Sequence, residues 1–172
     1  MLKIFHLRLK LFFIIILLMI LTSCIKSDDK YSEIPHIEFV SFTKINNGSN
    51  IDNQGIMKIF FTDGDGDIGL DKGDTFGRFH PDSIYYNNFF IKYFEKQNGI
   101  IKEVETKFSN NARIPMLTPQ GKNKTLKGEI EITLFINNPL SIYDTILFEA
   151  YIVDRALHKS NTIRTPEIKV NK

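Results

Sequence analysis

The sequence has few of the residues from which catalytic and transition-metal sites are usually built. It contains one cysteine, Cys24, so the chain cannot form an intrachain disulfide or carry a second structural thiol. After residue 23 the histidines are His36, His80 and His158, which stand apart from one another and from the cysteine. They predict neither a zinc site nor a nucleophilic catalytic centre. We therefore do not expect an enzyme.

Basic segments and helical patterns are also missing. No run of lysine and arginine, and no basic patch with interleaved aromatic residues, indicates nucleic-acid binding. Residues 1–23 carry three of the 22 Lys and Arg and none of the 20 Asp and Glu, so the remainder has a formal charge of −1. Beyond the N-terminus no window keeps a period of about 3.6 residues, which argues against long amphipathic helices.

The one long apolar run, residues 11–21, is shorter than the ~20 residues that a transmembrane helix needs. Lys3, Arg8 and Lys10 precede it, and this order predicts a signal peptide over residues 1–23. The run ends in Leu21-Thr22-Ser23-Cys24, which resembles the lipobox of bacterial lipoproteins. The resemblance implies cleavage before Cys24 and acylation of its thiol, so the membrane is a predicted partner.

A polar segment follows this cysteine, and we interpret residues 24–33 as the lipidated Cys24 and a flexible tether. Its Asp28-Asp29 pair resembles the surface-export signal of Bacteroidota lipoproteins. The resemblance implies an outer-membrane lipoprotein whose domain is displayed on the cell surface. The alternative is a plain solvated tether, which leaves the domain facing the periplasm.

Residues 34–172 have the pattern of a single all-β domain. Short segments rich in β-branched and aromatic residues recur between turn residues, at 35–42, 55–61, 89–96, 100–107, 126–136, 144–153 and 163–170. Residues 129–134 alternate strictly between polar and apolar, as in a strand with one buried face. About seven such segments predict an immunoglobulin-like or fibronectin-III-like β-sandwich. Gln97-Asn98-Gly99 predicts a tight hairpin.

The C-terminal residues also resemble part of such a domain. In residues 150–170 a strand ends in Asp154, a turn contains Ser160-Asn161, and a last strand follows, as in the final hairpin of many bacterial immunoglobulin-like and fibronectin-III-like domains. Leu157-His158 stands where those domains usually have Gly-Asn. Alternate loops of such a sandwich share one end, so we expect residues 62–88, 108–125 and 154–162 to lie together. Asp154 is then a candidate remote metal ligand, whereas Asp144 falls at the opposite end.

The loop after residue 62 is crowded with aspartates. Positions 1, 3, 5, 9 and 12 of one segment are Asp63, Asp65, Asp67, Asp71 and Asp74. This spacing resembles the calcium loops of EF-hand and dockerin proteins, in which position 7, here Gly69, contributes a backbone carbonyl. Ile68 departs from the glycine usual at position 6, and position 12 is Asp rather than Glu. Because calcium relieves repulsion among clustered carboxylates, we predict a structural calcium ion; a solvated acidic turn is the alternative.

Two tyrosines in the same long loop are candidate recognition residues. Tyr85 and Tyr86 precede two asparagines, and amphipathic rings beside amides suit a glycan or protein partner. The alternative is that both rings pack within the loop.

Longer runs of the sequence resemble a family of uncharacterised Bacteroidota lipoproteins. The resemblance rests on residues 60–70, 90–96 and 113–121, and it implies a class and a location but no activity. We therefore expect a lipid-anchored cell-envelope lipoprotein with structural calcium. A glycan- or protein-binding module of a surface nutrient-uptake system is the alternative. A hydrolase is a remote one, because carboxylates that share an ion are ionised and cannot act as general acids.

Overall fold

The computed structural model describes residues 31–46, 48–117 and 125–172. The predicted signal peptide, Cys24 and the tether up to residue 30 lie outside the described residues. Within the described ranges, no helix is long and apolar enough to cross a membrane.

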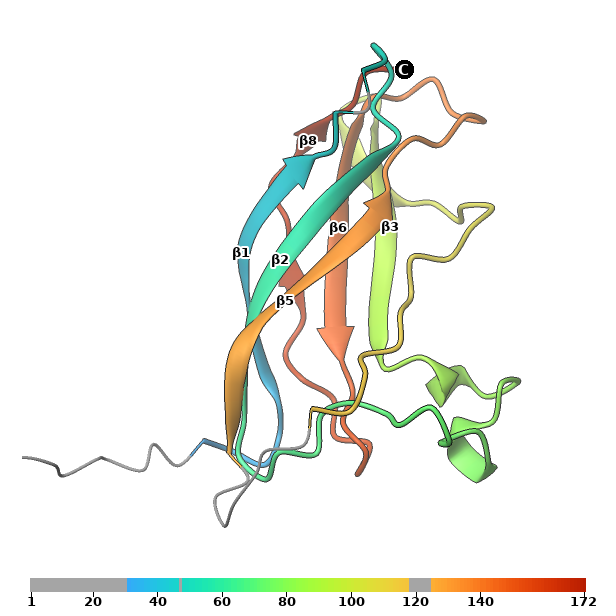
Figure 1. The fold of residues 1–172 in the computed structure, drawn as a ribbon. Coiled ribbons are helices and arrows are strands. Elements are labelled where there is room, and N and C mark those ends of the chain that lie inside the picture. The colour runs from blue at the N-terminus through green and yellow to red at the C-terminus, as the bar shows by residue number, and fades with distance from the viewer. Residues whose placement is uncertain (1–30, 47, 118–124) are drawn as a thin grey trace, which may run out of the picture.

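The described residues form two antiparallel sheets that pack as a sandwich (Figure 1). One sheet has the order β1-β2-β5 and consists of β1 (His36–Lys44), β2 (Gln54–Asp63) and β5 (Leu126–Phe135). The other contains β4 (Ile100–Glu103), β3 (Phe89–Gln97), β6 (Thr145–Ile152) and β7 (Ile163–Arg164) in that order, and β8 (Ile168–Lys169) also pairs with β6. The predicted all-β sandwich is confirmed.

The number of strands differs slightly from the expected seven. The last predicted segment, 163–170, is divided into β7 and β8 by Thr165-Pro166. Proline has no amide hydrogen and cannot donate to a sheet ladder. Thr165 takes over part of the pairing, because its hydroxyl oxygen accepts a hydrogen bond from the Phe148 amide at 3.0 Å and its own amide donates to the Phe148 carbonyl at 2.9 Å.

Alternation of side chains explains how the sheets bury their inner faces. In β2 every second residue is buried, and in β5 the same period separates charged outward positions from apolar inward ones. Phe148 of β6 lies in the resulting core, with its ring centroid 6.0 Å from that of Phe42 and 5.6 Å from that of Tyr93. The core therefore joins residues from both sheets.

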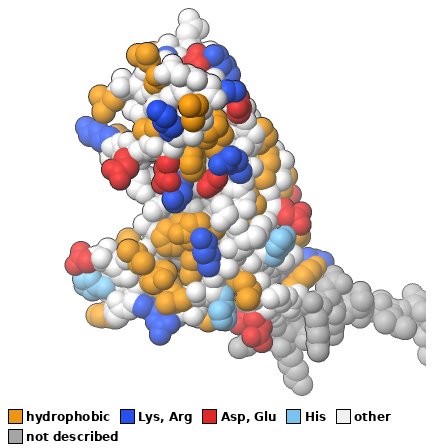
Figure 2. All heavy atoms as spheres, turned by 180° about the vertical axis from the view of Figure 1, so that it is seen from behind, with side chains coloured by type: hydrophobic (Ala, Val, Ile, Leu, Met, Phe, Trp, Pro, Cys, Tyr) orange, Lys and Arg blue, Asp and Glu red, His pale blue; other side chains and the backbone are white. Residues whose placement is uncertain are grey.

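The outer face of the second sheet is covered differently. Ion pairs cross it, among them Lys92–Glu103 at 2.9 Å and Arg164–Glu149 at 2.6 Å. Next to them the rings of Phe90 and Tyr151 stack at 4.9 Å. Figure 2 shows this side of the molecule, with charged side chains gathered between hydrophobic ones. Charge pairing across this sheet thus leaves its outer face compatible with solvent.

The predicted hairpin is confirmed, and the predicted grouping of loops is confirmed in part. Asn98 and Gly99 have φ angles of 54° and 83°, as a two-residue hairpin turn requires, and Gln97 pairs with Ile100. At one end of the sandwich, the Leu70 amide donates to the Ile114 carbonyl at 2.9 Å, and the Arg155 amide donates to the Asp67 carbonyl at 3.3 Å. Residues 62–88, 112–117 and 154–162 therefore meet at what we call the loop pole. Residues 108–110 instead lie towards the opposite end, where the Asn110 side chain accepts from the Phe135 amide at 3.0 Å and donates to the Phe135 carbonyl at 3.2 Å. Residues 118–124 of the predicted loop lie outside the described residues.

Candidate metal centre

Strand phase places Asp63 inside the protein. It is the last residue of β2 and follows Met57, Ile59 and Phe61 on the inward face, so its side chain is fully buried. One carboxylate oxygen, Oδ2, accepts hydrogen bonds from the amides of Asp67 at 2.9 Å and Ile68 at 3.3 Å. The other, Oδ1, has no hydrogen-bond partner among the described residues.

Two further carboxylates lie beside that of Asp63. Asp63, Asp65 and Asp67 each offer an oxygen, and these oxygens lie within 4.8 Å of one another. Oδ1 of Asp65 and Oδ1 of Asp67 are also buried without a partner in the described part of the chain. A buried polar atom without a partner costs free energy, and here three negatively charged ones share a single site. We call Asp63, Asp65 and Asp67 the aspartate triad.

The electrostatics of the aspartate triad reflect burial and mutual repulsion. Burial raises the pKa of Asp63 to about 6, and the neighbouring charge of Asp65 adds to the effect. Burial also raises the pKa of Asp67, and the negative charges of Asp154 and Asp65 contribute. Without a cation, the site therefore disfavours the charged forms of Asp63 and Asp67.

Asp154 lies beside the aspartate triad but is not a member of it. It is 1% exposed, and burial raises its pKa, with a contribution from the charge of Asp65. One of its oxygens, Oδ1, accepts from the His158 amide at 2.7 Å, and the other, Oδ2, lies 2.9 Å from His158 Nδ1. Histidine 158, which is isolated in the sequence, thus has a specific partner in the fold. Asp154, the predicted remote ligand, thus lies beside the aspartate triad, but its carboxylate already contacts His158.

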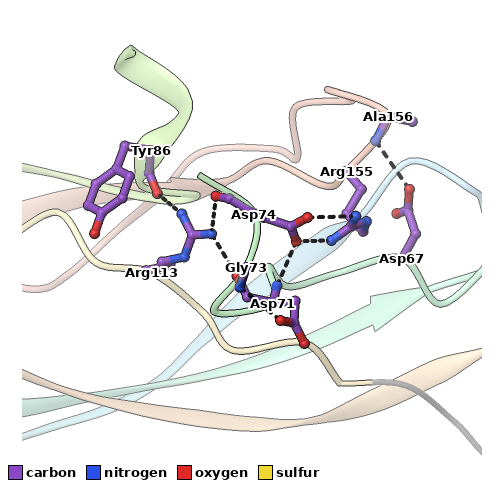
Figure 3. Close-up of polar contacts among 8 residues, drawn as sticks. All are labelled: Asp67, Asp71, Gly73, Asp74, Tyr86, Arg113, Arg155 and Ala156. Carbon is purple, nitrogen blue, oxygen red and sulfur yellow. Dashed lines mark hydrogen bonds and ion pairs between the residues drawn. The ribbon is translucent and has the colours of Figure 1, made fainter. Parts of the chain in front are cut away.

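Asp71 and Asp74 are not members of the aspartate triad, and Figure 3 shows their side chains turned to other partners than Asp67. The Asp74 carboxylate forms a two-point ion pair with the guanidinium of Arg155, which lowers the pKa of Asp74. Asp74 Oδ2 also accepts from the Asp71 amide at 2.7 Å, and Asp71 Oδ1 accepts from the Gly73 amide at 2.9 Å. These two carboxylates therefore close the second half of the loop on itself and tie it to residue 155.

Gly69 sits where the loop meets another chain segment. Its φ is +103°, and a Cβ there would lie 2.2 Å from the Pro115 carbonyl oxygen. On either side of it Ile68 and Leu70 are buried, and Leu70 forms a bridge with Pro115. The bend that an EF-hand makes at position 6 thus falls one residue later, because Ile68 enters the core.

Arg113 holds the far part of the loop and one of the predicted recognition residues. Its guanidinium donates to the carbonyl oxygens of Tyr86 at 2.6 Å, Asp71 at 2.8 Å and Asp74 at 2.7 Å (Figure 3). It also lies 5.0 Å from the Tyr86 ring centroid. Tyr85 and Tyr86 are both partly buried in the short helical turn η2 (Ile84–Tyr86), which follows a similar turn, η1 (Gly77–Phe79). Tyr86 therefore contributes to loop packing.

Known proteins give no further guidance at this point. Comparisons with protein-family models, with curated proteins and with solved structures found no match.

The donor set of the aspartate triad would suit a hard cation. Three carboxylates supply oxygen ligands only, and calcium, magnesium and manganese prefer oxygen over nitrogen or sulfur. The unpartnered Oδ1 atoms of the aspartate triad are the atoms that such a cation would contact. The residues present thus fit a calcium ion, and further oxygens from backbone carbonyls or water would complete its coordination.

Proposed function

We propose that this chain is a lipid-anchored cell-envelope lipoprotein whose loop pole is stabilised by one calcium ion. The observation that carries the calcium proposal is the set of three buried, unpartnered oxygens on Asp63, Asp65 and Asp67. A divalent cation offsets both the repulsion among these carboxylates and their lost hydration.

The ion would have a structural role, because it would act on a junction between both sheets. Asp63 ends β2 of the first sheet. Asp67 Oδ2 accepts from the Ala156 amide at 3.1 Å, and residue 156 follows β6 of the second sheet (Figure 3). Binding of Asp67 to a cation would therefore fix the acidic loop against the segment that follows β6. In a chain with one cysteine, such a cross-link takes the place that an inter-sheet disulfide has in other sandwiches.

Calorimetric titration of chelator-treated protein with calcium tests this proposal. We expect about one ion per chain, and we expect Asp65→Asn to abolish binding because it removes a charge and a ligand oxygen. Asp71→Asn is the matched control, since Asp71 is in the same loop but outside the aspartate triad. Loss of binding in both variants would favour the longer ligand set of an EF-hand-like loop, which includes Asp71. Absence of binding in the unsubstituted chain would contradict the proposal.

The anchor is proposed from the sequence, because Cys24 lies outside the described residues. Cys24→Ala should shift the protein from the membrane fraction to the soluble fraction, since several acyl chains are needed for durable attachment. A Cys24→Ala protein that still sediments with membranes after a salt wash would contradict acylation at this residue.

A further inference from the structure

The end of the sandwich opposite the loop pole contains an apolar cleft. Phe135, the last residue of β5, lines it, whereas Leu126 at the other end of that strand pairs with Asp63. The ten residues of β5 therefore lie between the cleft and the candidate metal centre, and a strand of this length spans roughly 30 Å. Its volume is about 450 Å³, within the range of roughly 300–1,000 Å³ that is usual for small-molecule sites.

The cleft walls expose large hydrophobic side chains to water. Phe108 is 59% exposed, Phe135 is 51% exposed and Leu140 is 87% exposed. The two phenylalanine rings lie 5.8 Å apart with a tilt of 36°, so they form a corner rather than a flat face. Covering these groups would be favourable. Three side chains make a small patch compared with the ~800 Å² per partner of a stable protein interface, which favours a small molecule as the occupant.

The floor of the cleft is polar but already saturated. Tyr93 lines the cleft, and its hydroxyl lies 3.3 Å from the buried carboxylate of Glu95. Glu95 also accepts hydrogen bonds from Asn138 at 3.1 Å and from Ser141 at 2.7 Å. The Glu95 side chain is fully buried behind these donors. The groups that face an occupant are therefore the apolar walls and the polar rim.

The rim of the cleft has one charge, and that charge is positive. Among the described residues that line the cleft, Lys107 is the only charged one. Its Nζ lies 5.6 Å from the Phe108 ring centroid, and in the described part of the chain it forms no ion pair with a carboxylate. Asn137 also lines the rim, and its amide makes only a long contact of 3.5 Å with Asn53. A cation and a weakly engaged amide beside an apolar corner suit an anionic head group on an apolar body.

We propose that this cleft binds a small amphipathic anion, with an aromatic or aliphatic body against Phe108, Phe135 and Leu140 and a carboxylate beside Lys107. The site is independent of the calcium proposal, because it uses no residue of the loop pole.

A pair of probes that differ only in charge tests the proposal. The full chain is titrated with phenylbutanoate and with phenylbutylamine, and binding is followed by ligand-observed nuclear magnetic resonance. We expect saturable binding of the acid and at least about fivefold weaker binding of the amine, because only the acid can pair with the lysine. Lys107→Met should remove most of this preference while leaving apolar binding in place.

Two exposed aliphatic side chains on the same loop provide a test variant and its matched control. Leu140 lines the cleft, whereas Ile142 is 90% exposed and does not line it. Both side chains are solvated, so neither Leu140→Ser nor Ile142→Ser should impair folding. We expect Leu140→Ser to weaken phenylbutanoate binding by roughly fivefold and Ile142→Ser to leave it unchanged. Equal effects of the two changes, equal or tighter binding of the amine, or no saturable binding of the acid would each overturn the proposal.

Discussion

Asp65→Asn should change thermal stability in opposite directions with and without calcium. Without a cation, the substitution removes one of three clustered negative charges and should stabilise the fold. With calcium, it removes a ligand oxygen and should abolish the stabilisation that binding provides. A side chain that only shapes the loop would act with the same sign in both conditions.

The size of the first effect follows from the pKa of Asp63. A rise from 3.8 to about 6 corresponds to a penalty of about 3 kcal/mol for the ionised side chain. Burial is the larger cause and the charge of Asp65 the second, so neutralising Asp65 should recover roughly 1 kcal/mol. For a domain of this size, that raises the melting temperature by about 3 °C.

The size of the second effect follows from linkage between binding and folding. Calcium at a hundred times its dissociation constant stabilises the native state by about 2.7 kcal/mol, or roughly 8 °C. The unsubstituted protein should gain this much and Asp65→Asn almost nothing. Thermal unfolding followed by circular dichroism, in chelator and in excess calcium, measures both. A lower melting temperature of Asp65→Asn in chelator, or no calcium response in the unsubstituted protein, would refute the reasoning.

Three further predictions concern pH, the loop backbone and local stability. In chelator, the free energy of unfolding should rise as pH falls from about 7 to 5, because the raised pKa of Asp63 means that the native state binds a proton more tightly than the unfolded chain does. Urea unfolding at several pH values measures this trend. In calcium the trend should reverse, because protons compete with the ion. Gly69→Ala should destabilise the fold by roughly 3 kcal/mol or more, since it adds a steric clash to an unfavourable φ. Gly99 also has a positive φ but has open space around it, so Gly99→Ala should cost only about 1–2 kcal/mol. Similar losses of stability in the two variants would contradict the close packing at residue 69. Hydrogen exchange should slow on calcium addition in residues 62–75, 112–117 and 154–162, and slowing confined to 62–75 would show that the loop is not coupled to its neighbours.

The strands and the aspartate triad are the features that local sequence could predict. Alternation defines β2 and β5, and Asn98-Gly99 defines the turn between β3 and β4, because these are properties of neighbouring residues. The aspartate triad spans five residues, and the phase of β2 alone turns Asp63 inward.

The other half of the acidic loop depends on contacts that local patterns do not contain. Arg155 pairs with Asp74 across 81 residues, and Arg113 reaches carbonyl oxygens of the same loop from 39 and 42 residues away. Burial of Ile68 also moves the bend to the next residue, so positions 9 and 12 of the calcium-loop spacing lie apart from positions 1, 3 and 5. Whether Gly69, Asp71 or Asp74 contributes a ligand remains a sequence-based prediction.

The most direct test of the calcium proposal is a crystal structure determined in calcium, with anomalous diffraction to locate the ion. The proposal predicts one peak at roughly 2.3–2.6 Å from oxygens of Asp63, Asp65 and Asp67. No peak between these carboxylates in a calcium-saturated crystal, or a peak bound by Asp71 and Asp74 instead, would contradict it.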